Sequence, residues 1–128
     1  MSKTPPRATF RRHERINDPK HFRRAFDRRR SAADDVLVVY GAENGLDHAR
    51  LGISVSRKKI RRATGRNRFK RLVREAFRLS KAELPAGVDL VVVPRGATLT
   101  FAHARRALPD LAKAVARRLR LSPTQAPP

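Results

Sequence analysis

The sequence of 128 residues contains no cysteine, no tryptophan and a single methionine, and it has only 11 acidic residues. Without cysteine, the chain can form neither a disulfide framework nor a thiolate metal site. Its longest uninterrupted apolar run is about five residues, whereas a membrane-spanning helix needs about 20. The first fifteen residues also lack the apolar segment of a secretory signal. We therefore expect a soluble, cytoplasmic protein that does not interact with a membrane.

Groups that would build a catalytic site are also scarce. The four histidines are scattered without HExxH spacing, and the chain has no glycine-rich phosphate loop. A metal-dependent nuclease needs several converging carboxylates, yet the one cluster in the sequence is the neighbouring pair Asp34 and Asp35. We therefore expect no catalytic residue and no metal or cofactor held by the protein alone.

Positive charge, by contrast, is abundant, with 31 lysines and arginines and a formal net charge of +20. The charge is uneven: residues 1–30 carry a net +8 and residues 57–81 a net +11, whereas residues 31–56 and 82–101 carry −3 and −1. Such an excess is typical of proteins that bind a polyanion. Because 40% of the residues are hydrophobic, the chain is also too apolar for a disordered basic tail.

Composition predicts one domain with a flexible segment at each end. Residues 1–13 are expected to form a disordered basic arm, residues 14–121 the folded domain, and residues 122–128, with three prolines, a disordered tail. Within the domain, Asp18 and Pro19 are an N-cap and a first helical residue, which predicts a helix that continues to about residue 29.

Two short segments in the near-neutral region have the pattern of strands. Residues 36–40 are rich in β-branched side chains, and residues 50–56 alternate apolar and polar. An Asn-Gly pair at residues 44–45 lies between them, so we predict an antiparallel hairpin. The second strand would have an apolar side of Leu51, Ile53 and Val55 and a polar side of Gly52, Ser54 and Ser56. Such small polar residues would let a bulky ligand reach the backbone, although an ordinary solvated sheet face has the same pattern.

The C-terminal part predicts a third strand at residues 88–93, closed by Pro94, and a final helix over residues 100–119 with Thr100 as its N-cap. Pro109 interrupts the helical pattern. The helix either kinks there or divides into two pieces, the second beginning with Pro109.

Within the basic stretch of residues 57–81, the spacing of the apolar residues predicts a helix with two unlike faces. At 100° per residue, one arc holds Phe69, Leu72, Val73, Ala76, Phe77 and Ser80. The opposite arc holds Asn67, Lys70, Arg71, Arg74, Arg78 and Lys81. A solvated face usually mixes charges of both signs, because each i,i+4 ion pair contributes about 0.2 to 0.5 kcal/mol. Here only Glu75 accompanies the cations, so we infer contact with a nucleic acid.

Aromatic side chains indicate which nucleic acid is bound. In the helix predicted after Asp18, Phe22 and Phe26 share one face, and Tyr40 lies in the first predicted strand. Stacking of these rings on unpaired bases would favour single-stranded RNA. Packing in a hydrophobic core is the alternative for the two phenylalanines.

Residues 65–78, GRNRFKRLVREAFR, resemble the signature helix of the bacterial ribonuclease P protein component, whose pattern is R-N-R-x-K-R-x-x-R-[EQ]-x-F. Residues 52–58, GISVSRK, resemble the same family's G-[LI]-S-V-S-[RK]-K segment, and the spacing of Phe22 and Phe26 resembles its first helix. The likeness covers roughly residues 14–120 in the family's order.

The resemblance implies an α+β fold, a single-domain α/β sandwich of order αβββαβα with a left-handed crossover around the signature helix. It implies a subunit of an endonuclease ribonucleoprotein, a hydrolase in tRNA processing that removes the 5′ leader from precursor tRNA. Catalysis and the magnesium ions would belong to the RNA subunit. The partners would be catalytic ribonuclease P RNA and precursor tRNA, with no DNA. A small basic ribosomal protein is the alternative that composition alone leaves open.

The resemblance also assigns two sets of residues. Those expected to bind the catalytic RNA are Lys58, Lys59, Arg66, Asn67, Arg68, Lys70, Arg71, Arg74 and Arg78. Those expected to line a cleft for the single-stranded leader, between the first helix and the sheet, are Phe22, Phe26, Tyr40 and Ser54.

Overall fold

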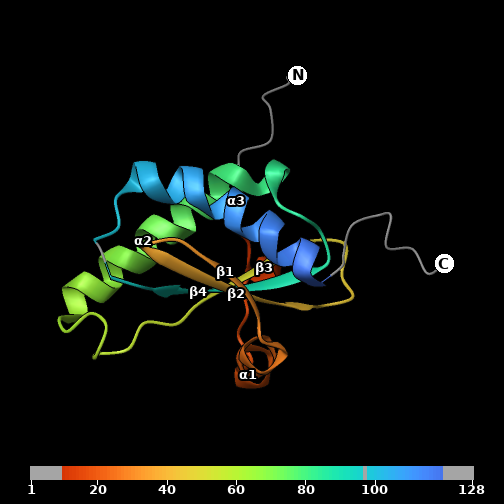
Figure 1. Cartoon of the computed structure of the whole chain (residues 1–128), viewed down its shortest axis with the longest axis horizontal. Coiled ribbons are helices and arrows are strands. Elements are labelled where there is room, and N and C mark those ends of the chain that lie inside the picture. Colours follow the sequence, from red (N-terminus) through yellow and green to blue (C-terminus); the bar gives the residue numbers. More distant parts are fainter. Residues whose placement is uncertain (1–9, 97, 120–128) are drawn as a thin grey trace.

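The computed structural model describes residues 10–96 and 98–119 (Figure 1). In chain order they form α1 (Pro19–Arg28), β1 (Arg30–Ala33), β2 (Leu37–Glu43), β3 (Arg50–Ile53), α2 (Ala63–Ser80), β4 (Val88–Pro94) and α3 (Phe101–Leu119). Two short 3-10 helices, η1 (Arg12–Glu14) and η2 (Lys81–Glu83), precede α1 and follow α2. The order αβββαβα and the mixed α+β class agree with the prediction.

The four strands form one sheet in the order β1-β2-β4-β3. β2 pairs antiparallel with β1 and β4, and β3 pairs parallel with β4. The hairpin predicted between the segments that became β2 and β3 is therefore wrong, because β4 lies between them. All residues of β4 except Val93 are buried, and a strand apolar on both sides is stable only in the interior of a sheet.

Helices cover both faces of the sheet, α2 and α3 on one side and α1 on the other (Figure 1). The larger apolar core lies under α2 and α3 and includes Phe77, Leu90 and Leu108. The smaller cluster, under α1, has four buried members, Ile16, Ala25, Ala42 and Val91. Partly buried hydrophobic residues packed against it are Phe22, Phe26, Tyr40 and Val93.

The helix starts follow local chemistry. Asp18 Oδ1 accepts a hydrogen bond from the Lys20 backbone N–H at 3.0 Å, as an N-cap should. α2 begins at Ala63, after the basic loop that precedes it. Five of the six residues at 57–62 are cationic, and like charges three or four positions apart oppose helix formation. The apolar arc predicted within α2 faces the core: Leu72 is half-buried and all the other members are buried.

α3 begins as predicted, with Thr100 Oγ1 accepting a hydrogen bond from the His103 N–H at 3.2 Å. The helix is continuous through the buried Pro109, so the alternative of two separate pieces is wrong. No helix within the described part of the chain is long and apolar enough to cross a membrane.

Most of the arm expected at residues 1–13, and the tail expected at residues 122–128, lie outside the described residues. The end of the expected arm instead packs on the domain. Phe10 meets Phe77 edge to face at 5.2 Å between ring centroids, and the following Glu14 forms an ion pair with Lys81 at 2.8 Å. Burial alone would raise the pKa of Glu14, but hydrogen bonds from Lys81 and the Arg11 backbone lower it overall.

Candidate nucleic-acid interface

The exposed face of α2 is a cationic surface anchored by the core beneath it. Phe69, Val73 and Phe77 fix the rotation of the helix by packing under it. That rotation leaves Asn67, Arg71 and Arg74 exposed and Lys70 half-buried. Within the described part of the chain, no side chain pairs with Lys70, Arg71 or Arg74. We call Asn67, Lys70, Arg71 and Arg74 the basic face.

Three other residues predicted to bind RNA make contacts within the protein. Arg66 donates from Nη1 to the carbonyls of Ile60 and Arg61, at 3.0 and 2.8 Å. Arg68 donates to the Leu99 carbonyl at 3.1 Å. The guanidinium of Arg78 forms an ion pair with Glu75 and lowers the pKa of that carboxyl. These arginines therefore hold local structure as well as presenting charge.

The basic face adjoins a hollow of about 150 Å³ between the N-terminal segment, β3 and α2. Its walls include Phe10, Ile16, Phe22, Gly52, Lys70 and Arg74. Phe22 comes from α1 and the two cations from α2, so the hollow brings the predicted aromatic and cationic sets together. We call it the Phe22 hollow. Its position was not predicted, because the sequence does not show that α1 and α2 reach the same edge of the sheet.

Gly52 makes the Phe22 hollow possible. A Cβ at this position would lie 2.7 Å from two atoms of the Phe22 ring and 3.2 Å from Ile16. The small residue predicted to admit a bulky ligand therefore first admits the protein's own phenylalanine. Phe22 remains only half-buried, so part of its ring faces the hollow.

The other residues predicted for the leader cleft do not line this hollow. Phe26 and Tyr40 meet edge to face at 4.9 Å between ring centroids, and both are half-buried. Ser54 follows β3, and its backbone N–H donates to the Val92 carbonyl at 3.0 Å. Both rings pack against the smaller apolar cluster under α1.

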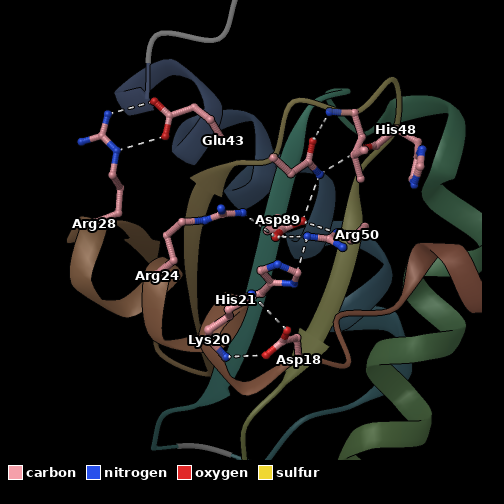
Figure 2. Close-up of polar contacts among 11 residues, drawn as sticks. Asp18, Lys20, His21, Arg24, Arg28, Glu43, His48, Arg50 and Asp89 are labelled. Atoms are coloured by element: carbon pink, nitrogen blue, oxygen red, sulfur yellow. Dashed lines mark hydrogen bonds and ion pairs between the residues drawn. The ribbon is translucent and has the colours of Figure 1, made fainter.

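A buried ionic network attaches α1 to the sheet (Figure 2). Asp89 of β4 is fully buried, and its two oxygens each accept a hydrogen bond from Arg50 at 2.7 Å. Asn44 donates to the same carboxylate at 2.9 Å, and Arg24 of α1 approaches it at 3.5 Å. His21 of α1 lies 3.4 Å from Arg50. Sequence reasoning missed this network, although a charged residue inside the apolar run of residues 88–93 was a visible sign of it.

A second ion pair joins the end of α1 to β2 (Figure 2). Arg28 donates two hydrogen bonds to Glu43, at 3.0 and 2.9 Å. The hydrogen bonds from Arg28 lower the pKa of Glu43. Together with Arg24 and Asp89, this pair engages much of the positive charge that α1 directs toward the sheet.

Comparison with known proteins identifies the family of this fold and surface. A family model described as Ribonuclease P matches residues 10–117. The chain belongs to the ribonuclease P protein family. The ribonuclease P protein component of Photobacterium profundum is 39% identical over 89 residues, which are 70% of this chain and 75% of the relative. That of Pseudomonas putida is 42% identical over 87 residues, 67% of this chain and 65% of the relative.

Solved ribonuclease P proteins share the fold. The protein from Thermotoga maritima superposes with a TM-score of 0.70 at 39% identity, covering 78% of this chain and 96% of that one. The chain is thus the protein subunit of ribonuclease P, an endoribonuclease complex of tRNA processing that includes ribonuclease P RNA. The ribosomal-protein alternative is set aside by this membership. Among the described residues, no group of three His, Asp or Glu side chains could hold a metal ion.

Proposed function

We propose that the basic face of this ribonuclease P protein binds the phosphates of the catalytic RNA, and that the Phe22 hollow receives the single-stranded 5′ leader of precursor tRNA. The observation that carries the proposal is the meeting of Phe22, Lys70 and Arg74 at one hollow. A stacking ring beside two cations suits an unpaired strand, whose bases stack and whose phosphates need positive charge.

The basic face supports the first half of the proposal, because its three cations have no partner within the part of the chain that the structure describes. Lys70, Arg71 and Arg74 repel one another along α2, and an RNA backbone would relieve that repulsion. Lys58 and Lys59 extend this charge into the loop before α2, where both side chains are exposed. Arg66, Arg68 and Arg78 contribute charge from side chains that are already oriented by other contacts.

We assign catalysis and magnesium to the RNA, as membership of the family implies, and the state of three carboxylates at or beside the sheet supports this assignment. Glu43 and Asp89 are each engaged by arginines, and Asp34 accepts hydrogen bonds from two backbone N–H groups. Carboxylates held in this way are poor ligands for a divalent cation, which prefers open oxygen donors. We propose that the protein acts in the cytoplasm, where it binds and orients the catalytic RNA and its substrate, precursor tRNA.

The leader assignment is tested with holoenzyme reconstituted from this protein and ribonuclease P RNA. Phe22→Leu keeps an apolar side chain against Gly52 but removes the aromatic face. We expect binding of precursor tRNA to weaken about tenfold, because stacking contributes roughly 1 to 3 kcal/mol per base, while binding of mature tRNA is unchanged. The matched control is Phe101→Leu, at an exposed ring on α3. Equal losses for both tRNAs would contradict the leader assignment.

A further inference from the structure

Two further hollows lie at the N-terminal end of α2, around the loop of residues 57–62. The first is wide and open, about 550 Å³, and its walls are four cations, Arg57, Lys58, Arg61 and Arg66. The second is about 300 Å³ and has an apolar floor that includes Ile60, Phe69 and Leu99. Three cations, Lys59, Arg68 and Arg95, line the second hollow as well. No carboxylate lines either one.

The second hollow is built from side chains that other contacts already hold. Phe69 and Leu99 are each 4% exposed and belong to the main core. The guanidinium of Arg68 is fixed by its hydrogen bond to the Leu99 carbonyl. Ile60 can pack against residue 65 because that residue is glycine: a Cβ there would lie 2.8 Å from Ile60 Cγ2. A ligand entering this hollow would therefore meet a site whose floor does not have to be ordered first.

The loop joins the two hollows in a fixed relation. Residues 57, 58 and 61 face the first hollow, whereas residues 59 and 60 face the second. The loop between them is tied to α2, because Arg66 donates to the carbonyls of both Ile60 and Arg61. Within the described residues, no carboxylate pairs with the cationic groups of Arg57, Lys58 or Lys59. The loop of residues 57–62 thus lines both a cationic surface and an apolar pocket that has cations among its walls.

We propose that the second hollow receives the base of one unpaired nucleotide of the RNA partner, while the four cations of the first hold the neighbouring phosphates. The inference rests on the proposed RNA-binding function and adds to it a single base-accepting pocket away from the Phe22 hollow. Cations alone are enough to bind a phosphate, as in the first hollow. The apolar floor of the second hollow would not contribute to binding a phosphate. A nucleobase has apolar faces for Phe69 and Leu99, and its π-system accepts the guanidinium of Arg68.

Size and charge both fit this occupant. Pockets that enclose small ligands span about 300 to 1,000 Å³, and the second hollow is at the lower end of that range, which suits one base with its sugar at the mouth. The two hollows have seven cations and, among the described residues, no carboxylate in their walls, which favours an anionic ligand. An unpaired nucleotide within an RNA supplies one apolar group and phosphates on both sides of it.

The test fills the pocket without changing the charge. Thr98 is exposed and lines the second hollow, whereas Ala102, four residues later, is exposed and does not line it. Thr98→Trp and Ala102→Trp are compared for binding to full-length ribonuclease P RNA over a range of salt concentrations. We expect the Kd of Thr98→Trp to rise about tenfold with an unchanged log–log salt slope, and that of Ala102→Trp to stay within about twofold. Equal Kd values for the two variants would overturn the proposal.

Chemical probing of the unpaired bases in the same RNA provides the second readout. One base protected by the wild-type protein should become reactive in the Thr98→Trp complex and stay protected with Ala102→Trp. Thr98→Leu, a smaller filling, should give an intermediate result if the tryptophan variant is poorly folded by circular dichroism. A complex in which no unpaired base changes reactivity would contradict the pocket.

Two controls separate this inference from the proposed function and from a free nucleotide. If the wild-type protein fails to bind the RNA, the proposed function fails; if it binds and Thr98→Trp binds equally well, only the pocket fails. Binding of AMP alone that is lost in Thr98→Trp, with RNA binding unaffected, would assign the hollow to a free nucleotide and overturn its assignment to RNA.

Discussion

The two faces of the sheet carry positive charge in different ways. A large apolar core packs α2 and α3 against the sheet. On that side, the cations of the basic face have no partners among the described residues. Under α1 the buried apolar cluster has only four members, and Arg24, Arg28 and Arg50 are paired with carboxylates of the sheet. The cations under α1 thus hold the fold, whereas Lys70, Arg71 and Arg74 of the basic face are available for a partner. Net charge alone does not distinguish these uses.

The largest expected effect comes from breaking the network under α1. Asp89→Ala removes the buried partner of Arg50, whose side chain is only 16% exposed. We expect the free energy of unfolding to fall by about 3 to 5 kcal/mol, because an unpaired buried charge is costly. Chemical denaturation measures the loss, and Asp110→Ala on the exposed side of α3 is the matched control. A loss below about 1 kcal/mol would show that the network does not attach α1.

A smaller effect is expected where the two faces meet. Gly52→Ala places a Cβ against the Phe22 ring and should cost about 1 to 3 kcal/mol through overpacking. The cost should shrink when Phe22→Leu is combined with it, because the two side chains share one contact. Additive losses, measured by thermal unfolding of the single and double variants, would mean that the glycine does not serve the Phe22 contact.

The basic face should respond in binding and not in stability. Arg71 is exposed and does not line the Phe22 hollow, so Arg71→Ala should leave the unfolding free energy within about 0.5 kcal/mol. It should lower the log–log salt slope of RNA binding by roughly 0.7 to 0.9, the value of one phosphate contact. Arg106→Ala, at an exposed arginine of α3, should leave the slope unchanged. Identical slopes for wild type and Arg71→Ala would remove this residue from the interface.

The smallest effect concerns the half-buried pair of Arg28 and Glu43. Because the folded state lowers the pKa of Glu43, the pair stabilises the fold above the ordinary glutamate value of about 4.3. That contribution is lost as the pH falls through the lowered pKa of the folded state. Glu43→Gln should therefore slightly lower the melting temperature at pH 7 and have no effect in strong acid. A difference from wild type that is the same at both pH values would contradict the ion pair.

Local features were predictable from the sequence. Asp18 caps α1 because a carboxylate satisfies free backbone N–H groups at a helix start, and the apolar arc of α2 is buried because its spacing follows the helical period. These interactions join residues a few positions apart, so the pattern contains both partners.

Features that join distant segments were not predictable in the same way. The strand order depends on β4 entering between β2 and β3, and the weak apolar pattern of β1 gave no indication of the true hairpin partner of β2. Arg68 was predicted as an RNA contact without its hydrogen bond to Leu99, which lies 31 residues away. The Phe22 hollow likewise required the arrangement of α1, β3 and α2.

The outer side of β3 has a consequence for self-association. β3 is an edge strand, and the N-terminal segment covers its beginning, where the Ile16 N–H donates to the Leu51 carbonyl at 2.9 Å. Uncovered edges pair readily with other chains, and the net charge of +20 keeps copies of the free protein apart. Bound RNA neutralises that repulsion, so the cover over β3 matters most when several copies are crowded on RNA.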